Sequence, residues 1–277
     1  MPTSVGVVIP TFNRAHTLGR ALDSVFSQTL QPQQVIVVDD GSTDSTADLV
    51  AGYSEVSYLR QENRGVSGAR NLGIRRCGCE WIALLDSDDE WLPEKLEVQF
   101  GALAENPGYR LIHCDEIWIR NGRRVNAADR HRKRGGWIFE HCLPLCVISP
   151  SAAVIEKGLL EEVGGFNEGL PACEDFDLWL RVCSRYPVLY VDRPLLCKYG
   201  GHDDQLSRKH WGMDRFRVRA LRDLISEGRL SESDRQAALA NLREKCRILV
   251  NGARKRGNAE VEAEYEALLA QFEGPGA

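Results

Sequence analysis

The sequence lacks any long apolar run and any basic leader. No stretch approaches the roughly 20 apolar residues that a membrane helix needs. The first residues, Met1 to Val5, lead at once into a strand-like segment, without the basic region that opens a signal peptide. We therefore expect a soluble, cytoplasmic protein whose contact with a membrane would be peripheral, at its inner face.

An excess of positive charge is also missing. The 277 residues include 35 Lys and Arg against 40 Asp and Glu, a net charge of −5, so a large electrostatic footprint for nucleic acid is not expected. The cysteines number nine, and neither Cys77-Gly78-Cys79 nor the pair Cys142 and Cys146 has the spacing of a zinc site. We expect these thiols to be reduced and mostly buried.

Two common nucleotide-binding motifs are absent. No Gly-x-Gly-x-x-Gly follows the first apolar segment, and the chain has no Gly-x-x-x-x-Gly-Lys-Ser/Thr. Dinucleotide-dependent dehydrogenases and P-loop enzymes are therefore disfavoured. Asp39 or Asp40 could instead accept hydrogen bonds from a base or a ribose. Ser42, Thr43 and Asp44, which follow, are typical of a helix N-cap.

Strand and helix patterns alternate through the first hundred residues. Apolar runs typical of buried strands cover residues 5–9, 35–38, 56–59 and 81–85, with Pro10 ending the first. Helical spacing lies between them. This alternation predicts a parallel α/β sheet, in which ligands bind beyond the carboxyl ends of the strands. Polar clusters occupy three such ends, at residues 10–14, 39–44 and 86–89.

The most acidic of these clusters is Asp86-Ser87-Asp88-Asp89. Carboxylates so close repel one another unless a cation lies between them. Oxygen ligands on a loop suit Mg²⁺ or Mn²⁺, which bind through one or two carboxylates and complete their shells with phosphate and water. The alternative is an acidic turn that caps the helix beginning near Pro93.

The order and spacing of several motifs resemble those of glycosyltransferase family 2. The resemblance covers about residues 4–200. Its first-half motifs are Pro10-Thr11-Phe12-Asn13-Arg14, Val37-Val38-Asp39-Asp40-Gly41-Ser42-Thr43-Asp44, Asn63-Arg64-Gly65-Val66-Ser67-Gly68-Ala69-Arg70-Asn71 and Leu85-Asp86-Ser87-Asp88-Asp89. The resemblance implies a GT-A fold, a nucleotide-diphospho-sugar donor, Mn²⁺ or Mg²⁺, and inversion at the anomeric carbon.

The same resemblance assigns donor-site residues position by position. The nucleotide pocket would be lined by Pro10, Thr11 and Arg14, with Phe12 packing near the base, Asp40 contacting the base and Arg70 contacting the nucleotide or diphosphate. In the acidic motif, Asp86 and Ser87 would lie on the nucleotide-sugar, Asp86 nearer the ribose. Asp88 would bind the metal with Asp86, and Asp89 is a further candidate.

A second acidic segment lies in the other half of the chain. Phe176, Trp179, Leu180 and Cys183 fit one apolar helix face, which places Glu174 and Asp175 at the helix N-terminus. The helix dipole alone would account for one of these acids. Gly164-Gly165-Phe166 followed by this segment again resembles the family, and implies that Asp175 is the catalytic base, with Glu174 as the alternative. An inverting transfer needs such a base within hydrogen-bond reach of the acceptor hydroxyl.

Three further segments are harder to interpret. Residues 123–136 are basic: they suit either a solvated, mobile loop or a contact with an anionic acceptor or membrane surface. No aromatic residue interrupts the basic cluster, which disfavours single-stranded nucleic acid. Strands are predicted at residues 111–120, 148–154 and 188–191. His202 would be a metal ligand, a diphosphate donor or an ordinary polar loop histidine.

We expect a GT-A domain over residues 1–207 and a helical C-terminal extension over residues 208–277. The extension would pack on the core, form a homodimer or bear on the acceptor. The predicted activity is metal-assisted, inverting transfer of a sugar to a glycan or lipid-linked acceptor in polysaccharide biosynthesis. A UDP-sugar is the favoured donor, and GDP and dTDP sugars remain open. Two alternatives remain: a non-catalytic sugar-nucleotide-binding scaffold, or a sugar-1-phosphate nucleotidyltransferase, although residues 10–14 lack the Gly-rich basic loop of the latter.

Overall fold

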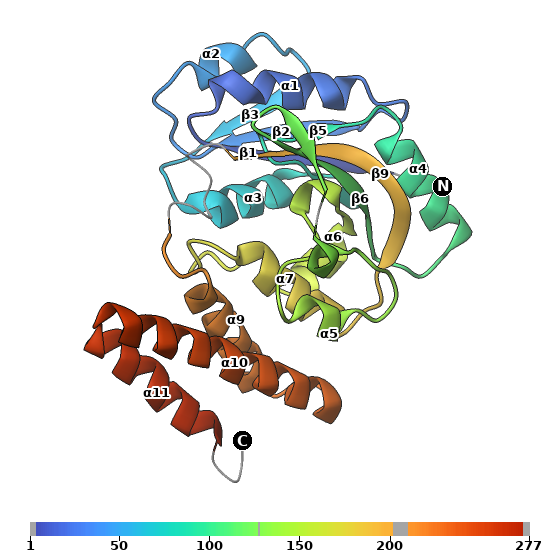
Figure 1. Cartoon of the computed structure of the whole chain (residues 1–277). Coiled ribbons are helices and arrows are strands. Elements are labelled where there is room, and N and C mark those ends of the chain that lie inside the picture. The colour runs from blue at the N-terminus through green and yellow to red at the C-terminus, as the bar shows by residue number, and fades with distance from the viewer. Residues whose placement is uncertain (1–3, 127, 202–209, 274–277) are drawn as a thin grey trace.

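The computed structural model describes residues 4–126, 128–201 and 210–273, and a mixed sheet of nine strands forms its centre (Figure 1). The strand order is β3-β2-β1-β4-β8-β6-β9-β5, with β7 paired to β6. The first four strands are parallel as predicted, whereas β8 runs antiparallel to β4 and β6. The strands are β1 (Val5–Thr11), β2 (Gln34–Asp39), β3 (Val56–Arg60), β4 (Trp81–Leu84), β5 (Glu90–Trp91), β6 (Leu111–Arg120), β7 (Arg123–Val125), β8 (Val154–Glu156) and β9 (Leu189–Gly200).

Helices cover both faces of the sheet. Val7 and Ile9 of β1 pack in one hydrophobic cluster and Val8 in another, as expected for a strand buried on both sides. The first cluster includes α1 (Ala15–Phe26), α2 (Thr46–Val50) and α4 (Lys95–Glu105). The second includes α3 (Gly65–Arg76), α5 (Phe139–Cys142), α6 (Lys157–Glu162) and α7 (Glu174–Cys183). In Figure 1, α1 and α2 lie above the sheet, and α3, α6 and α7 lie below it.

Pro10 does not end β1, which continues to Thr11. The prediction failed because of where the missing N–H points. The carbonyl of Val8 accepts a hydrogen bond from Leu85 N, so Val8 and, two residues later, Pro10 direct their backbone toward β4. Pairing with β4 stops at Val8, before Pro10, whereas pairing with β2 continues through Pro10 to Thr11 and keeps β1 extended.

Two other predicted segments differ from the structure. Instead of a strand over residues 148–154, the chain forms a 3₁₀ turn, η2 (Pro150–Ala152), and only then β8, because proline suits the first position of a helical turn. Residues 123–136 are not a solvated loop throughout: they contain β7 and a second 3₁₀ turn, η1 (Asp129–His131). Within them Lys133 is buried and pairs with buried Glu116 at 3.1 Å.

Gly73 lets α3 approach the sheet closely. A Cβ at this position would lie 2.5 Å from Val8 Cγ1 and 3.2 Å from Val38 Cγ2. We expect Gly73→Ala to lower the free energy of unfolding by about 1–3 kcal/mol, because the overlap outweighs the gain in helix propensity. Gly101→Ala in α4, where nothing lies within 4 Å, is the matched control and should stabilise by up to about 1 kcal/mol. Urea unfolding compares the two, and equal effects would contradict the packing argument.

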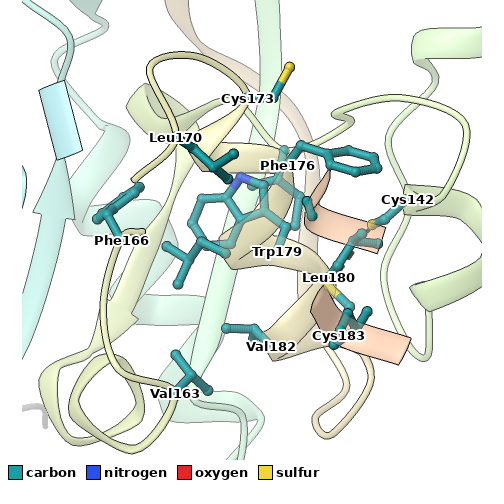
Figure 2. Packing of buried hydrophobic residues seen from close by; sticks show 14 of the residues in the cluster. Cys142, Val163, Phe166, Leu170, Cys173, Phe176, Trp179, Leu180, Val182 and Cys183 are labelled. Carbon is teal, nitrogen blue, oxygen red and sulfur yellow. Dashed lines mark hydrogen bonds between the residues drawn. The ribbon is translucent and has the colours of Figure 1, made fainter. Parts of the chain in front are cut away.

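The helix that carries the second acidic motif is buried around most of its circumference. The predicted apolar face is confirmed: Phe176, Trp179, Leu180 and Cys183 are all buried. Figure 2 shows the Trp179 indole at the centre of this cluster, with Phe166 and Leu170 of the preceding loop beside it. This packing fixes α7, and with it the position of Glu174 and Asp175.

The C-terminal helices pack on the same cluster, as one of the alternatives predicted. They are α9 (Asp214–Ser226), α10 (Glu232–Arg256) and α11 (Ala259–Glu273). Leu221 and Leu239 are fully buried, and the Ser231 hydroxyl caps α10 by accepting from Asp234 N at 3.1 Å. The predicted boundary at residue 207 falls outside the described residues and stays a prediction. All nine cysteines are free thiols, seven of them buried, and no described helix is long and apolar enough to cross a membrane.

Candidate active site

The polar clusters of the first half meet at one edge of the sheet, as predicted. Thr11 pairs with Asp39 across β1 and β2, and Val8 pairs with Leu84 across β1 and β4. The segments that follow β1, β2 and β4 therefore leave the sheet side by side. This edge is the carboxyl end of three adjacent parallel strands, where ligands bind in such sheets.

The loops after β1 and β2 are tied to each other. Asn13 adopts a left-handed backbone (φ 53°), and its side-chain oxygen accepts from Thr43 N at 2.8 Å. Ser42 Oγ accepts from Asn13 N at 2.8 Å. Asp44 accepts from the first residue of each helix, Ala15 N at 3.1 Å and Thr46 N at 3.0 Å. The N-cap positions themselves are Arg14 and Ser45, so of the three predicted capping residues only Asp44 binds the helix starts, and it binds both.

Two residues of the first motif carry groups that the described part of the protein leaves unsatisfied or uncovered. Thr11 is buried, and no group in the described part of the chain hydrogen-bonds its Oγ1. A buried hydroxyl without a partner is costly, so it fits a site completed by a bound molecule. The Phe12 ring is 42% exposed beside it. The polar atom and the flat apolar face suit a nucleoside.

Asp40 holds the start of α3. One of its oxygens accepts from Gln61 Nε2 at 2.6 Å and Arg64 N at 2.8 Å, and the other from Gly65 N at 2.8 Å. These contacts occupy much of the carboxylate. Its contact with a base stays a prediction. Asp39 is fully buried and accepts from Ser42 N at 2.7 Å and from the Tyr58 hydroxyl.

Arg70 connects the two acidic motifs. Its guanidinium donates to Asp86 Oδ1 at 2.7 Å and to Glu174 Oε1 at 2.6 Å, and its side chain is 3% exposed. Burial would lower the pKa of Arg70, but the two carboxylates outweigh it and raise the pKa. Burial, followed by the neighbouring Asp175, raises the pKa of Glu174 despite this ion pair. In this structure the guanidinium of Arg70 is engaged with these two carboxylates. Its direct contact with a nucleotide or diphosphate therefore also stays a prediction.

Residues 86–89, which follow β4 after Leu85, form a tight turn. Asp89 N donates to Asp86 O at 3.0 Å, and Ser87 is buried. Asp89 accepts from the Ser151 hydroxyl at 2.6 Å and from Tyr199 N at 2.9 Å. Burial raises the pKa of Asp89 well above its usual value, and the nearby acids add to this. Asp89 therefore joins the turn to β9 through hydrogen bonds. Asp86 and Asp88, which are partly exposed, are the acids of this turn at the surface of the site.

Asp88 borders a pocket of about 250 Å³ between α1 and the turn that joins β6 to β7. Arg14, Arg20 and Tyr199 also line it. Among the described residues, no three His, Cys, Asp or Glu side chains gather as a metal site. Two carboxylates are nevertheless a donor set that suits Mg²⁺ or Mn²⁺ carried in with a phosphate-bearing substrate. His202 lies outside the described residues.

Asp175 is the second residue of α7, and the residue before the helix, Cys173, has a left-handed backbone (φ 61°). Its Oδ1 accepts from Phe176 N at 2.7 Å, and its Oδ2 accepts from the Cys146 thiol at 3.2 Å. Glu174 is buried and engaged with Arg70, whereas Asp175 is partly exposed. Of the two predicted candidates, Asp175 is the one that a substrate hydroxyl can approach.

Sequence analysis did not single out two groups near Asp175, the ammonium of Lys198 and the thiol of Cys146. Lys198 donates to Ser149 Oγ at 2.9 Å. Burial alone would lower the pKa of Lys198, but Glu116, Asp89 and, more weakly, Cys146 and Asp175 raise it. Lysine in an otherwise apolar strand segment was a usable signal, because a buried cation needs acidic partners. Nothing in the sequence marked Cys146.

Comparison with known proteins identifies the family of the chain. The model of glycosyl transferase family 2 matches residues 6–162. A Rickettsia conorii protein named as an uncharacterised glycosyltransferase is 29% identical over 70% of this chain, and the chain covers only 32% of it. The Escherichia coli UDP-Glc:alpha-D-GlcNAc-diphosphoundecaprenol beta-1,3-glucosyltransferase WfgD is 29% identical over 70% of this chain and 75% of its own length.

Solved structures share the fold. Residues 1–349 of TarS from S. aureus, in complex with UDP-GlcNAc, give a TM-score of 0.72 at 19% identity, over 98% of this chain and 79% of that one. The mannosyltransferase PcManGT of Pyrobaculum calidifontis, with GDP-Man and Mn²⁺, gives 0.65 at 18% identity, over 98% and 84%. Both the fold prediction and the family resemblance are thereby confirmed: the chain has the GT-A fold and belongs to glycosyl transferase family 2.

Proposed function

We propose that the chain transfers a sugar from a nucleotide-diphospho-sugar to an acceptor hydroxyl, with inversion and with Asp175 as the base. The observation that carries the proposal is the bridge made by Arg70, which binds both Asp86 and Glu174, the latter 104 residues away from Arg70 in sequence. Asp175, next to Glu174, is thereby held near the acidic turn. Asp86 and Asp88 could hold a cation against the donor diphosphate, and Asp175 could take the proton of the acceptor.

In the proposed reaction, Asp175 accepts the proton of the acceptor hydroxyl while that oxygen attacks the anomeric carbon. The attack comes from the face opposite the diphosphate, and the carbon passes through an oxocarbenium-like state. Asp88 and Asp86 would hold Mn²⁺ or Mg²⁺. When bound, the cation neutralises charge on the departing diphosphate. Thr11 and Phe12 would contact the nucleoside.

UDP is the favoured nucleotide. WfgD is named as using UDP-Glc, and the TarS structure contains UDP-GlcNAc. PcManGT binds GDP-Man, so a GDP-sugar is the main competitor. WfgD is also named for a lipid-diphosphate acceptor, which favours a glycan or lipid-linked acceptor in surface polysaccharide biosynthesis, at the cytoplasmic side of a membrane.

Nucleotide binding tests the donor site. Calorimetric titrations with UDP, GDP and dTDP, each with Mn²⁺ and then with EDTA, should show metal-dependent binding of one of them. We expect Asp88→Ala to weaken that binding by about 100-fold, since a direct metal ligand should matter at least as much as an outer-shell partner. Asp48→Ala, which removes an exposed carboxylate from α2, is the control. Absence of metal-dependent binding to any nucleotide would contradict the proposal, and binding without turnover would favour the scaffold alternative.

A further inference from the structure

Basic side chains gather around Trp118 on the hairpin of β6 and β7. Arg120 lies directly opposite Arg123 across the two strands, so their side chains share one face with Trp118. The guanidinium of Arg120 lies 5.2 Å from the centre of the Trp118 ring, and the His131 ring lies 5.0 Å from it. Arg130 is hydrogen-bonded to His131 at 3.4 Å. We call this group (Arg120, Arg123, Arg130 and His131 around Trp118) the hairpin cluster.

The three arginines of the hairpin cluster have no carboxylate partner among the described residues. Among residues 4–126, 128–201 and 210–273, no carboxylate lies within 4.0 Å of the guanidinium groups of its three arginines. The nearest acids in sequence are Asp129, which is exposed, and Glu116, which is paired with Lys133 and also accepts from Trp118 Nε1 at 2.7 Å. Other arginines of this chain do have carboxylate partners, such as Arg64 with Glu168 at 2.8 Å.

This arrangement is unfavourable without a ligand. Like charges directly opposite each other on a hairpin destabilise it. The chain as a whole has a net charge of −5, so acids are not scarce. The cluster also creates a positive potential: burial, followed by Arg130 and Lys198, lowers the pKa of His131. An anion bound over the cluster would relieve the repulsion.

The hairpin cluster adjoins the reaction centre. The Lys198 ammonium lies 5.8 Å from the centre of the Trp118 ring, and Asp89 and Asp175 are among the acids that act on it. On the other side, Asn121 and Gly122 in the hairpin turn line the pocket that Asp88 borders. A group held by the cluster would therefore lie next to both the donor side and the base.

We infer that the hairpin cluster binds a phosphate group carried by the acceptor, close to the sugar whose hydroxyl is attacked. Arginine is suited to this role because its planar, forked guanidinium donates two parallel hydrogen bonds to phosphate oxygens. The inference deepens the proposed function and rests on it, because it names the class of acceptor: a glycan linked through phosphate, either a lipid diphosphate or a polyol phosphate.

The test compares two triple variants that lose the same three charges. Arg120→Ala/Arg123→Ala/Arg130→Ala removes the arginines of the cluster. Arg75→Ala/Arg76→Ala/Arg229→Ala removes three exposed arginines elsewhere. Calorimetry measures binding of farnesyl diphosphate, glycerol 1-phosphate and farnesol, with the donor site saturated by Mg²⁺ and the nucleotide identified above. Circular dichroism checks that both variants are folded.

We expect the wild type and the control variant to bind at least one phosphate probe and neither to bind farnesol. The cluster variant should lose at least about tenfold in affinity, the loss expected if a single charge-assisted contact is removed. Tighter binding of farnesyl diphosphate indicates a lipid-linked acceptor, and equal binding of glycerol 1-phosphate indicates a polyol phosphate.

Two results with these probes would overturn the inference: no binding of either phosphate probe to the wild type, or equal weakening of binding in both variants. A third would be binding only to phosphatidylglycerol vesicles, tested as a further probe, which would indicate a membrane surface instead. Nucleotide binding is measured on the same proteins. If the wild type shows no metal-dependent nucleotide binding, the proposed function is refuted. In that case the phosphate probes, titrated without nucleotide, still decide whether the cluster binds phosphate.

Discussion

Asp175→Asn should reduce turnover about 10³-fold and leave donor binding unchanged, because general-base catalysis contributes 10²- to 10⁴-fold. The substitution preserves shape: the side-chain oxygen of Asn can still accept from Phe176 N, as Asp175 does at 2.7 Å. What is lost is the ability to take the acceptor proton. The measurement is the steady-state rate together with calorimetric donor binding.

Loss of a negative charge at the N-terminus of α7 costs about 0.3–1 kcal/mol, so the variant should remain folded. Glu140→Gln, in α5, is a control that removes an exposed carboxylate from the first turn of another helix. Turnover close to the wild-type rate in Asp175→Asn, with donor still bound, would exclude Asp175 as the base. Reduced donor binding would instead place Asp175 in the donor site.

Arg70→Met should lower the free energy of unfolding by about 3–5 kcal/mol, the usual cost of breaking a buried ion pair on one side. Asp86 and Glu174 would then face each other without the cation that separates them. Glu174 already has a raised pKa, and loss of Arg70 should raise it further. A carboxyl whose pKa is raised on folding destabilises the native state as pH rises above the unfolded value. The loss should therefore be larger at pH 8 than at pH 5, as measured by urea unfolding.

Arg64→Met provides the matched control. Arg64 pairs with Glu168 at 2.8 Å, but its side chain is 61% exposed, so its removal should cost at most about 1 kcal/mol. The double variant Arg70→Met/Glu174→Gln should recover part of the stability, because it removes one of the two unpaired charges. An Arg70→Met variant as stable as Arg64→Met, or with the same stability loss at both pH values, would contradict this account of the bridge.

The sequence by itself determined the first parallel strands and the place of the site. The apolar runs at residues 5–9, 35–38 and 81–85 can be buried only as strands of a covered sheet, and three of these strands end in polar motifs. Local chemistry also fixed the acidic start of α7 and the cap of α10. These features depend on residues a few positions apart, which is why pattern and propensity were sufficient.

The tertiary structure alone decided what each polar side chain contacts. Asp40 caps α3, Asp89 joins its turn to β9, and Lys133 is buried against Glu116. Arg70 binds Asp86 and also Glu174, which lies 104 residues further along the chain than Arg70. Pro10 remains in its strand only because the neighbouring strand ends first. The physical reason is the same in each case: the partner of a buried charge or backbone group is chosen by the packing of elements distant in sequence, and no local pattern records that choice.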